Sequence, residues 1–499
     1  MMKTHKRMQQ NPVVRAIVKW QTTLWYPIVY ALLCAVSGLF GKQVYIPVAL
    51  IVSVSIIFST LYVDDLKVLL VPFFMSLYLI GTDNPGYMVT QREDALGVFD
   101  TRAFTFIIVL GVIDLIFVCV RLCREGIFRA LSRKPHFLFG ILALDIAYLL
   151  AGLFSPKWNP TGLMSGALFA LGLTVCYLIF SDVIHRDRDP YTYISFCMML
   201  SALVVLIQTA VVVLRLHAAG ELVFLNVTDR QAILNHNKIQ LSWGYSTNIA
   251  GVMILGIPAA IYLAKTCRFS LVSYALSLSL LLGALVTGTR TATLVGGVML
   301  VVCLFIACIK GKNAKLLRYY TVITILLATV AVLYIDQNVI SIRDTVLPDL
   351  LSYLRLNEES LSGMSTRVEL WINGVEDFLE SPVFGVGFAD GGYTEESSYS
   401  SVVNDMYHNI GIQFLGAMGV VGVLAFLWHL KDVGMALFRR FSLDRTLLLM
   451  VAVTVLAASL ADNFFFYFNF QIFYVASLVL AEHHLANTPP RRIPSQEKS

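Results

Sequence analysis

Long apolar runs recur along almost the whole chain. Most are about 18 or more residues long, which is enough for one α-helix to cross the hydrocarbon core of a membrane. The pattern predicts an all-α, polytopic helical membrane protein with about fourteen transmembrane helices (12–14) and one long extracytoplasmic loop that contains short helices. The expected spans are 24–40, 43–61, 66–81, 103–120, 136–154, 161–181, 191–214, 243–264, 270–287, 292–309, 319–335, 409–428, 446–461 and 463–481.

The polar segments divide the chain into five parts. They are a basic tail (1–23), a transmembrane bundle (24–334), a large loop (335–408), C-terminal transmembrane helices (409–482) and a second tail (483–499). Most of the 37 Lys and Arg residues fall in segments that this scheme puts inside if both termini are cytoplasmic. Because cytoplasmic loops of membrane proteins carry an excess of Lys and Arg, we expect both termini inside and the large loop outside.

Composition narrows the class of protein. With 57% hydrophobic and 14% charged residues, the chain has too few charges to cover a soluble globule. The net charge of +5 therefore reflects topology and contact with anionic lipid, and we expect no nucleic-acid partner. All eight cysteines fall within spans or inner loops and show no close metal-type cluster, so we expect packing residues rather than disulfides or a metal site.

The large loop contains one stretch that reads as a water-facing helix, "STRVELWINGVEDFLESPVFGVGF". Thr366 with Glu369 fits a capping box, which predicts a helix N-terminus there. The helix should end near Ser381-Pro382, because a residue before proline disfavours the α region. Four glycines then indicate a compact turn: Gly385, Gly387, Gly391 and Gly392. The apolar face expected from helical spacing is Val368, Trp371, Ile372, Val375 and Phe378.

Two arginines lie on the outer side in this scheme. Arg367 falls in the first turn of the predicted helix, where free N–H groups and the helix dipole favour an anion, so a cation fits best if an anion lies between them. Arg290 lies in "TGTRTA" between two apolar runs, and a charge so near hydrocarbon should face a cavity with a partner. No acid is near Arg290 in sequence, which favours a bound anion. A solvated Arg367 and a snorkelling Arg290 are the alternatives.

His408, in "YHN", lies at the outer boundary of the next span. A neutral imidazole is a good general base, and a nearby cation keeps it unprotonated. A capping or interface histidine is the alternative. Two arginines and one histidine at the same depth on the same face fit a diphosphate clamp with a base, and that is the interpretation we test.

Other polar residues suggest weaker alternatives. "DRD" (Asp187 to Asp189) resembles a metal-binding DxD motif, but it is short and lies in an inner loop. Asp114 and Asp145 fall within predicted spans and would serve as a proton relay or as structural acids. Gly385-x-Gly387 follows no strand of a βαβ unit, which excludes a dinucleotide motif. We expect neither a metal nor a cofactor.

Three stretches together resemble the signature of the bacterial O-antigen ligase and polysaccharide polymerase superfamily. They are "TGTRTA", the Arg-x-x-x-Trp helix that ends in Pro-x-x-Gly-x-Gly, and "YHNIGIQFLGAMGVVGVLAF"; the upstream "GYSTNIAGVMILGIP" is also similar. The resemblance covers about 245–430. It implies an integral-membrane GT-C-like glycosyltransferase of the bacterial inner membrane, active on its outer face. Arg290 and Arg367 look like the diphosphate-binding arginines and His408 like the essential histidine. Thr366 and Asn409, beside them, complete the expected substrate-binding set.

The resemblance also implies the reaction and its partners. The donor would be an undecaprenyl-diphosphate-linked glycan and the acceptor a glycan or lipid hydroxyl, joined by a metal-independent inverting transfer. Membrane lipid, a chain-length regulator and a flippase are further candidate partners. Family ligases commonly have about twelve spans, and some relatives add a C-terminal periplasmic domain, which we do not expect in this chain. The extra spans favour a polymerase over a ligase. A flippase for the same lipid-linked sugar, or a membrane sensor or scaffold, is the competing class.

Overall fold

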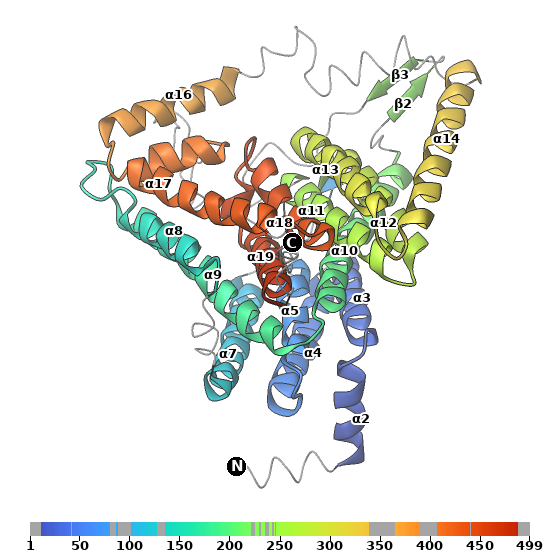
Figure 1. Cartoon of the computed structure of the whole chain (residues 1–499), viewed down its shortest axis with the longest axis horizontal. Coiled ribbons are helices and arrows are strands. Elements are labelled where there is room, and N and C mark those ends of the chain that lie inside the picture. Colours follow the sequence, from blue (N-terminus) through green and yellow to red (C-terminus); the bar gives the residue numbers. More distant parts are fainter. Residues whose placement is uncertain are drawn as a thin grey trace, which may run out of the picture. The chain divides into compact units, whose positions relative to one another are not determined.

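The computed structural model describes residues 11–40, 42–79, 86–87, 101–126, 135–220, 225–228, 231–234, 239–241, 244, 246–338, 365–388, 407–439 and 441–487. The chain divides into two compact units. The first consists of Met1–Ile127 and Asp189–Val368, and the second of Phe128–Arg188 and Glu369–Ser499. Figure 1 shows the helices of both units, coloured along the sequence.

The first unit contains most of the helices and four short strands. Its helical segments are α2 (Pro12–Gln21), α3 (Trp25–Phe40), α4 (Lys42–Tyr62), η1 (Leu66–Leu69), α5 (Leu70–Met75), η2 (Ser76–Leu79), α7 (Thr101–Glu125), α10 (Tyr191–Ala218), α11 (Ser246–Thr266), α12 (Ser270–Val286), α13 (Arg290–Ile309) and α14 (Ala314–Asn338). Its strands are β1 (Gly86–Tyr87), β2 (Leu225–Thr228), β3 (Gln231–Leu234) and β4 (Ile239–Gln240). They form two antiparallel pairs, β1 with β4 and β2 with β3.

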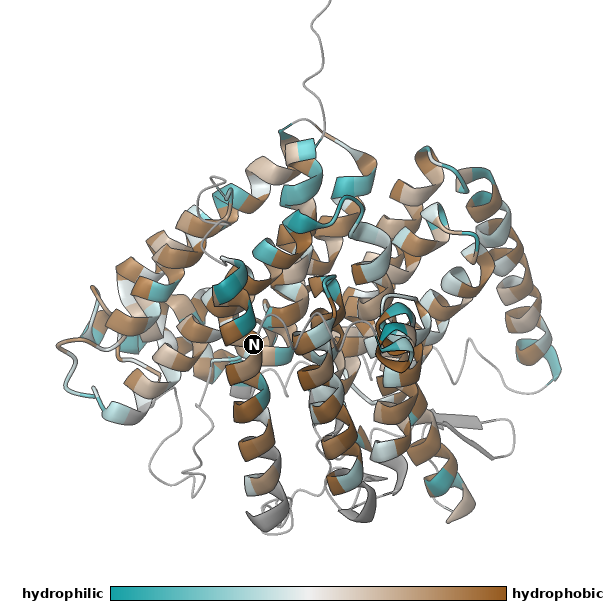
Figure 2. Cartoon of the chain, turned by 90° about the horizontal axis from the view of Figure 1, so that it is seen from below, coloured by the Kyte–Doolittle hydropathy of each residue, from teal (hydrophilic) through white to brown (hydrophobic). Residues whose placement is uncertain are grey.

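Helix α11 forms the centre of the first unit. It is buried along almost its whole length and contacts α10, α12 and α13. Gly256 lets α10 approach closely, since a Cβ at this position would overlap Ala202. Helix α14 is the opposite case, because its apolar side chains are almost all exposed. Figure 2 shows that apolar residues predominate along most of the helices, as expected for membrane-spanning segments.

The second unit contains α8 (Leu138–Leu150), α9 (Pro160–Arg186), α17 (Ile410–Phe438), α18 (Leu443–Ala458), η7 (Phe464–Phe466), α19 (Phe468–Asn487) and, from Glu369 onward, most of α16 (Ser365–Glu380). Aromatic rings fill part of its core. Tyr148 of α8 lies 6.0 Å from Phe388 and 6.2 Å from Phe414, measured between ring centroids. Phe466 packs against the same rings. This cluster joins the end of the glycine turn to three helices of the unit.

The all-α class is confirmed, with two short strand pairs and one isolated β-bridge, between Leu241 and Gly244, as the β structure among the described residues. Six described helices are long and apolar enough to cross a membrane, namely α9, α10, α11, α13, α14 and α17. Every other predicted span coincides with helical structure, but the number of crossings stays a prediction. Two predicted spans contain more than one helical segment, namely 66–81 with the contiguous η1, α5 and η2, and 463–481 with η7 and α19. The tail and loop boundaries also stay predictions.

Candidate active site

Arg290 is the first residue of α13. The preceding break is the predicted hinge: α12 ends at Val286, and Gly288 takes a left-handed conformation with φ of +79°. Thr289 caps the helix in extended conformation, and its hydroxyl is buried without a hydrogen-bond partner among the described residues. The helix N-terminus thus presents a guanidinium and an unsatisfied hydroxyl beside free backbone N–H groups, the chemistry that anion binding uses.

Arg367 lies in the first turn of α16, as predicted, and is half-buried. The helix begins at Ser365, so Thr366 lies inside it and the predicted N-cap at Thr366 is wrong by at least one residue. The side chain of Thr366 lies outside the described residues. The helix ends at Glu380, directly before Ser381-Pro382, as the proline predicts.

The buried face of α16 differs from the predicted one. Ile372 and Val375 are 52% and 41% exposed, whereas Leu370 is 5% and Asp377 6% exposed. Gly374 lies on the same buried face. Helical periodicity located the helix, but the face that packs inward contains a carboxylate and a glycine. Asp377 and Gly374 face inward because both contact Tyr407 in the second unit.

The glycine turn after α16 docks into a break in α17. At Gly419 the helix takes a non-helical conformation (φ 61°, ψ −154°), which frees backbone groups on both sides. The N–H groups of Val386 and Gly387 donate to Gly416 O and Ala417 O at 3.0 Å, and Val420 N–H donates to Pro382 O at 2.9 Å. The Pro-x-x-Gly-x-Gly segment therefore supplies the hydrogen bonds that the broken helix lacks, a requirement for irregular backbone at membrane depth.

His408 lies in the turn between this region and α17. Its φ is +52°, a left-handed conformation that costs a non-glycine residue about 1–2 kcal/mol. Asn409 caps α17 by accepting from Gly411 N–H at 2.9 Å and Ile412 N–H at 3.2 Å, and its amide donates to Leu460 O at 2.8 Å. These contacts fix the turn. A substrate-binding role for Asn409 stays a prediction.

The imidazole of His408 has a carboxylate partner that sequence reasoning missed. Its Nδ1 lies 3.1 Å from Oδ1 of Asp462, which is buried, while the histidine side chain is 35% exposed. The same Oδ1 accepts from Asn463 N–H at 2.8 Å. In the neutral tautomer whose Nδ1–H donates to this carboxylate, Nε2 carries a lone pair and can accept a proton. The sequence does contain one signal for this partner, because Asp462 is a single acid at the turn between the last two predicted spans.

The residue before the histidine is also anchored. Tyr407 is fully buried, and its hydroxyl donates to Oδ2 of Asp377 at 2.5 Å. Oδ1 of Asp377 accepts from Lys157 at 2.7 Å, and Lys157 lies 3.0 Å from Glu380. Burial alone would lower the pKa of Lys157, but the bonds and charges of the two carboxylates raise it above its usual value.

The other candidate residues have more ordinary surroundings. Asp114 accepts a hydrogen bond from Ser53 at 2.7 Å in the first unit, and Asp145 accepts one from Thr174 in the second. These bonds favour the structural interpretation of both acids. Among the described residues, no group of three or more His, Cys, Asp or Glu side chains is arranged to hold a metal ion. All eight cysteines are free.

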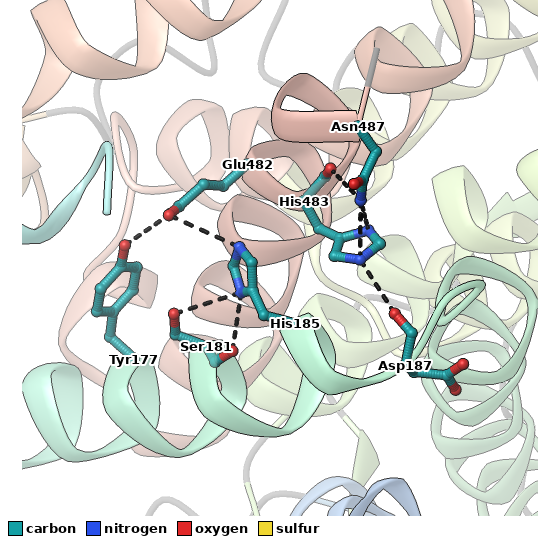
Figure 3. Close-up of polar contacts among 7 residues, drawn as sticks. All are labelled: Tyr177, Ser181, His185, Asp187, Glu482, His483 and Asn487. Atoms are coloured by element: carbon teal, nitrogen blue, oxygen red, sulfur yellow. Dashed lines mark hydrogen bonds and ion pairs between the residues drawn. The ribbon is translucent and has the colours of Figure 1, made fainter. Parts of the chain in front are cut away.

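The second unit also has a polar pocket of about 570 Å³, at the C-terminal ends of α9 and α19. Figure 3 shows its main contacts: Tyr177 donates to Glu482 at 2.6 Å, and His483 donates to the backbone oxygen of Asp187 at 3.1 Å. His185 donates to Ser181 O at 2.8 Å. None of the predicted site residues lines this pocket.

Arg290 belongs to the first unit and His408 to the second, and Arg367 precedes the boundary between them by one residue. The convergence of the three side chains stays a prediction.

Comparison with known proteins gives independent information about the family. Residues 275–427 match a family model described as O-antigen ligase. The matched segment includes Arg290, Arg367 and His408 but ends before Asp462. No curated protein matches the chain.

Proposed function

We propose that this chain transfers a glycan from an undecaprenyl-diphosphate-linked donor to an acceptor hydroxyl. The premise is that residues 275–427 make it a member of the O-antigen ligase and polysaccharide polymerase superfamily. The reaction would take place at the outer face of the bacterial inner membrane, in surface polysaccharide biosynthesis. The observation that carries the proposal is the contact between His408 and Asp462, which leaves Nε2 of a half-exposed imidazole able to accept a proton.

The proposed step is one displacement. Nε2 of His408 takes the proton of the acceptor hydroxyl as the acceptor oxygen attacks the anomeric carbon. The bond from this carbon to the diphosphate oxygen breaks, and undecaprenyl diphosphate leaves. A single displacement inverts the anomeric centre. General-base catalysis of this kind contributes about 10²–10⁴-fold to a rate.

Arg290 and Arg367 would hold the diphosphate. Each lies in the first turn of a helix, so its guanidinium adds to the positive end of the helix dipole and to free N–H groups. Charge that develops on the leaving diphosphate would be stabilised there, with no metal required in this scheme. Thr366, in the first turn of α16, belongs to the same anion site in this proposal.

The experiment uses purified full-length protein with a lipid-linked glycan donor and measures released undecaprenyl diphosphate and the extended or transferred glycan. We expect release by the wild type and its loss in Arg290→Ala, Arg367→Ala and His408→Ala. If the wild type releases none while proteoliposomes move the lipid across the bilayer, the protein is a flippase. If the three variants leave surface glycan unchanged in cells, it is a sensor or scaffold.

The lipid-linked glycans of a His408→Ala strain separate the two forms of the proposal. Single repeat units on the surface indicate a polymerase, and long glycans left on the carrier indicate a ligase. The predicted span number favours the polymerase. A polymerase would act beside a flippase and a chain-length regulator, which are the proposed partners.

A further inference from the structure

The side chain of Tyr407 connects the candidate base to α16. Its hydroxyl donates to Asp377 at 2.5 Å, and its backbone N–H donates to Gln413 at 3.0 Å. Its ring lies directly against Gly374 of α16 and Gly416 of α17, since a Cβ at either glycine would lie within about 3.0 Å of ring atoms. Tyr407 is therefore fixed by its hydroxyl, its backbone and its ring at once.

Burying the carboxylate of Asp377 costs free energy that an apolar side chain would not cost. The residue is 6% exposed, and a buried carboxylate costs free energy unless its oxygens are hydrogen-bonded and its charge is paired. An apolar residue at this position would extend the buried face begun by Leu370. Instead, each oxygen of Asp377 has a separate donor, Tyr407 on one side and Lys157 on the other. Directional bonds of this kind fix position rather than add stability.

The backbone of His408 explains why position matters here. His408 has a left-handed backbone conformation, so the direction of its side chain depends on how both neighbouring residues are held. Asn409 is held by the start of α17 and by Leu460. Tyr407 is held by α16. The direction of the imidazole toward Asp462 therefore depends on α16 as well as α17.

We infer that Asp377, oriented by Lys157, is a positioning residue for His408: through the hydroxyl of Tyr407 it holds the turn in the conformation that aims the imidazole. The inference rests on the proposed function of His408 as the base. Asp377 touches no reacting atom in this scheme.

The test starts from Tyr407→Phe, which removes one hydroxyl and keeps the ring between the two glycines. A misaimed base slows the chemical step without weakening donor binding, so we expect kcat to fall about 10-fold with an unchanged KM for the donor. Tyr274→Phe is the matched control. It removes a hydroxyl that donates to Thr324 at 3.0 Å in the first unit, and kcat should stay at the wild-type value.

Further variants at Asp377 and Lys157 separate positioning from simple stability. Asp377→Asn combined with Tyr407→Phe should be no slower than the worse single variant, because both act through one contact. Lys157→Arg keeps the cation beside Asp377 and should retain kcat, whereas Lys157→Met should lower it. A residue that only stabilises the fold would lower the melting temperature and leave kcat per folded molecule unchanged.

Hydrogen exchange gives a readout that does not depend on activity. In Tyr407→Phe the amides of residues 369–380 and 407–411 should exchange faster than in the wild type, while those of α11 stay unchanged. Wild-type kcat or unchanged exchange in Tyr407→Phe would overturn the inference. If the wild type transfers no glycan, the proposed function fails, and exchange alone decides whether the hydroxyl orders this segment. Should Tyr407→Phe not fold, Lys157→Met is measured in the same way.

Discussion

The second unit places a histidine near a carboxylate at each of its two ends. We call them the His408 end (Lys157, Asp377, Tyr407, His408 and Asp462) and the His483 end (Tyr177, His185, Asp187, Glu482 and His483). Lys157 lies just before α9 and His185 in its last turn, so the 27 residues of this helix separate the two ends by about 40 Å.

The two ends differ in what their histidines are free to do. At the His408 end the ring lies in a left-handed turn, is 35% exposed and has a carboxylate on one nitrogen only. At the His483 end, His185 uses Nδ1 for a backbone oxygen of its own helix, and its Nε2 is 3.9 Å from Glu482. His483 is almost fully buried. A histidine beside an acid can act as a base only where one nitrogen can reach a substrate.

The largest expected effect comes from removing each histidine in turn. His408→Ala should lower glycan transfer by about 10²–10⁴-fold, because the acceptor hydroxyl loses its base. His483→Ala should keep the wild-type rate per folded molecule. Release of undecaprenyl diphosphate by the purified variants measures both. Comparable losses in the two variants would erase the proposed difference between the ends.

The carboxylates give the next test. Asp462→Asn removes the charge that holds the proton on Nδ1 of His408, and we expect transfer to fall by about 10- to 100-fold while donor KM changes little. Glu482→Gln is the matched change at the His483 end, where the amide oxygen can still accept from Tyr177. It should leave transfer unchanged. If Asp462→Asn is as active as the wild type, Asp462 is only a structural partner of the turn.

A third prediction concerns packing at the His408 end. Gly374→Ala places a Cβ against Ile412 and the ring of Tyr407, so α16 must shift. Overpacking of this kind costs about 1–3 kcal/mol, and the shift should also slow transfer. Gly434→Ala, in α17 of the same unit, meets nothing within 4 Å and should be neutral. Thermal unfolding in detergent measures both, and equal melting temperatures for the two variants would contradict the packing at Gly374.

Sequence reasoning located the elements better than their contacts. Apolar run length placed helical structure at every predicted span, because the cost of unpaired backbone in lipid leaves few alternatives to a helix. It could not show that 66–81 combines 3-10 and α-helical segments, since a composition suited to a span does not determine the helix type. Arg367 was placed correctly in the first turn of α16, whereas Arg290, expected in the hinge before its span, is the first residue of α13.

The missing part of the site consists of long-range contacts. Asp462 lies 54 residues after His408, and Asp377 lies 220 residues after Lys157. No local period encodes such pairs. The buried face of α16 was predicted wrongly for the same reason: hydrophobicity favoured Ile372 and Val375, while the actual face is set by a tyrosine ring that needs Gly374 and a hydroxyl that needs Asp377.

The smallest expected effect is an acid sensitivity at the His483 end. Burial, with a smaller effect of the neighbouring His185, lowers the pKa of His483 to about 4, whereas an unfolded histidine titrates near 6.5. Between these values the unfolded chain binds the proton and the folded chain does not, so stability falls as the pH drops below about 6.5 and levels off below about 4. His483→Gln cannot take up this proton. Its melting temperature should therefore fall less than that of the wild type between pH 7 and pH 4, by about a few degrees.

The measurement is thermal unfolding of both proteins across this range, with transfer by His483→Gln at pH 7 expected at the wild-type rate. Parallel pH curves for the two proteins would show that the His483 ring is accessible to protons in the folded state, and the contrast between a buried and an available histidine would then not hold.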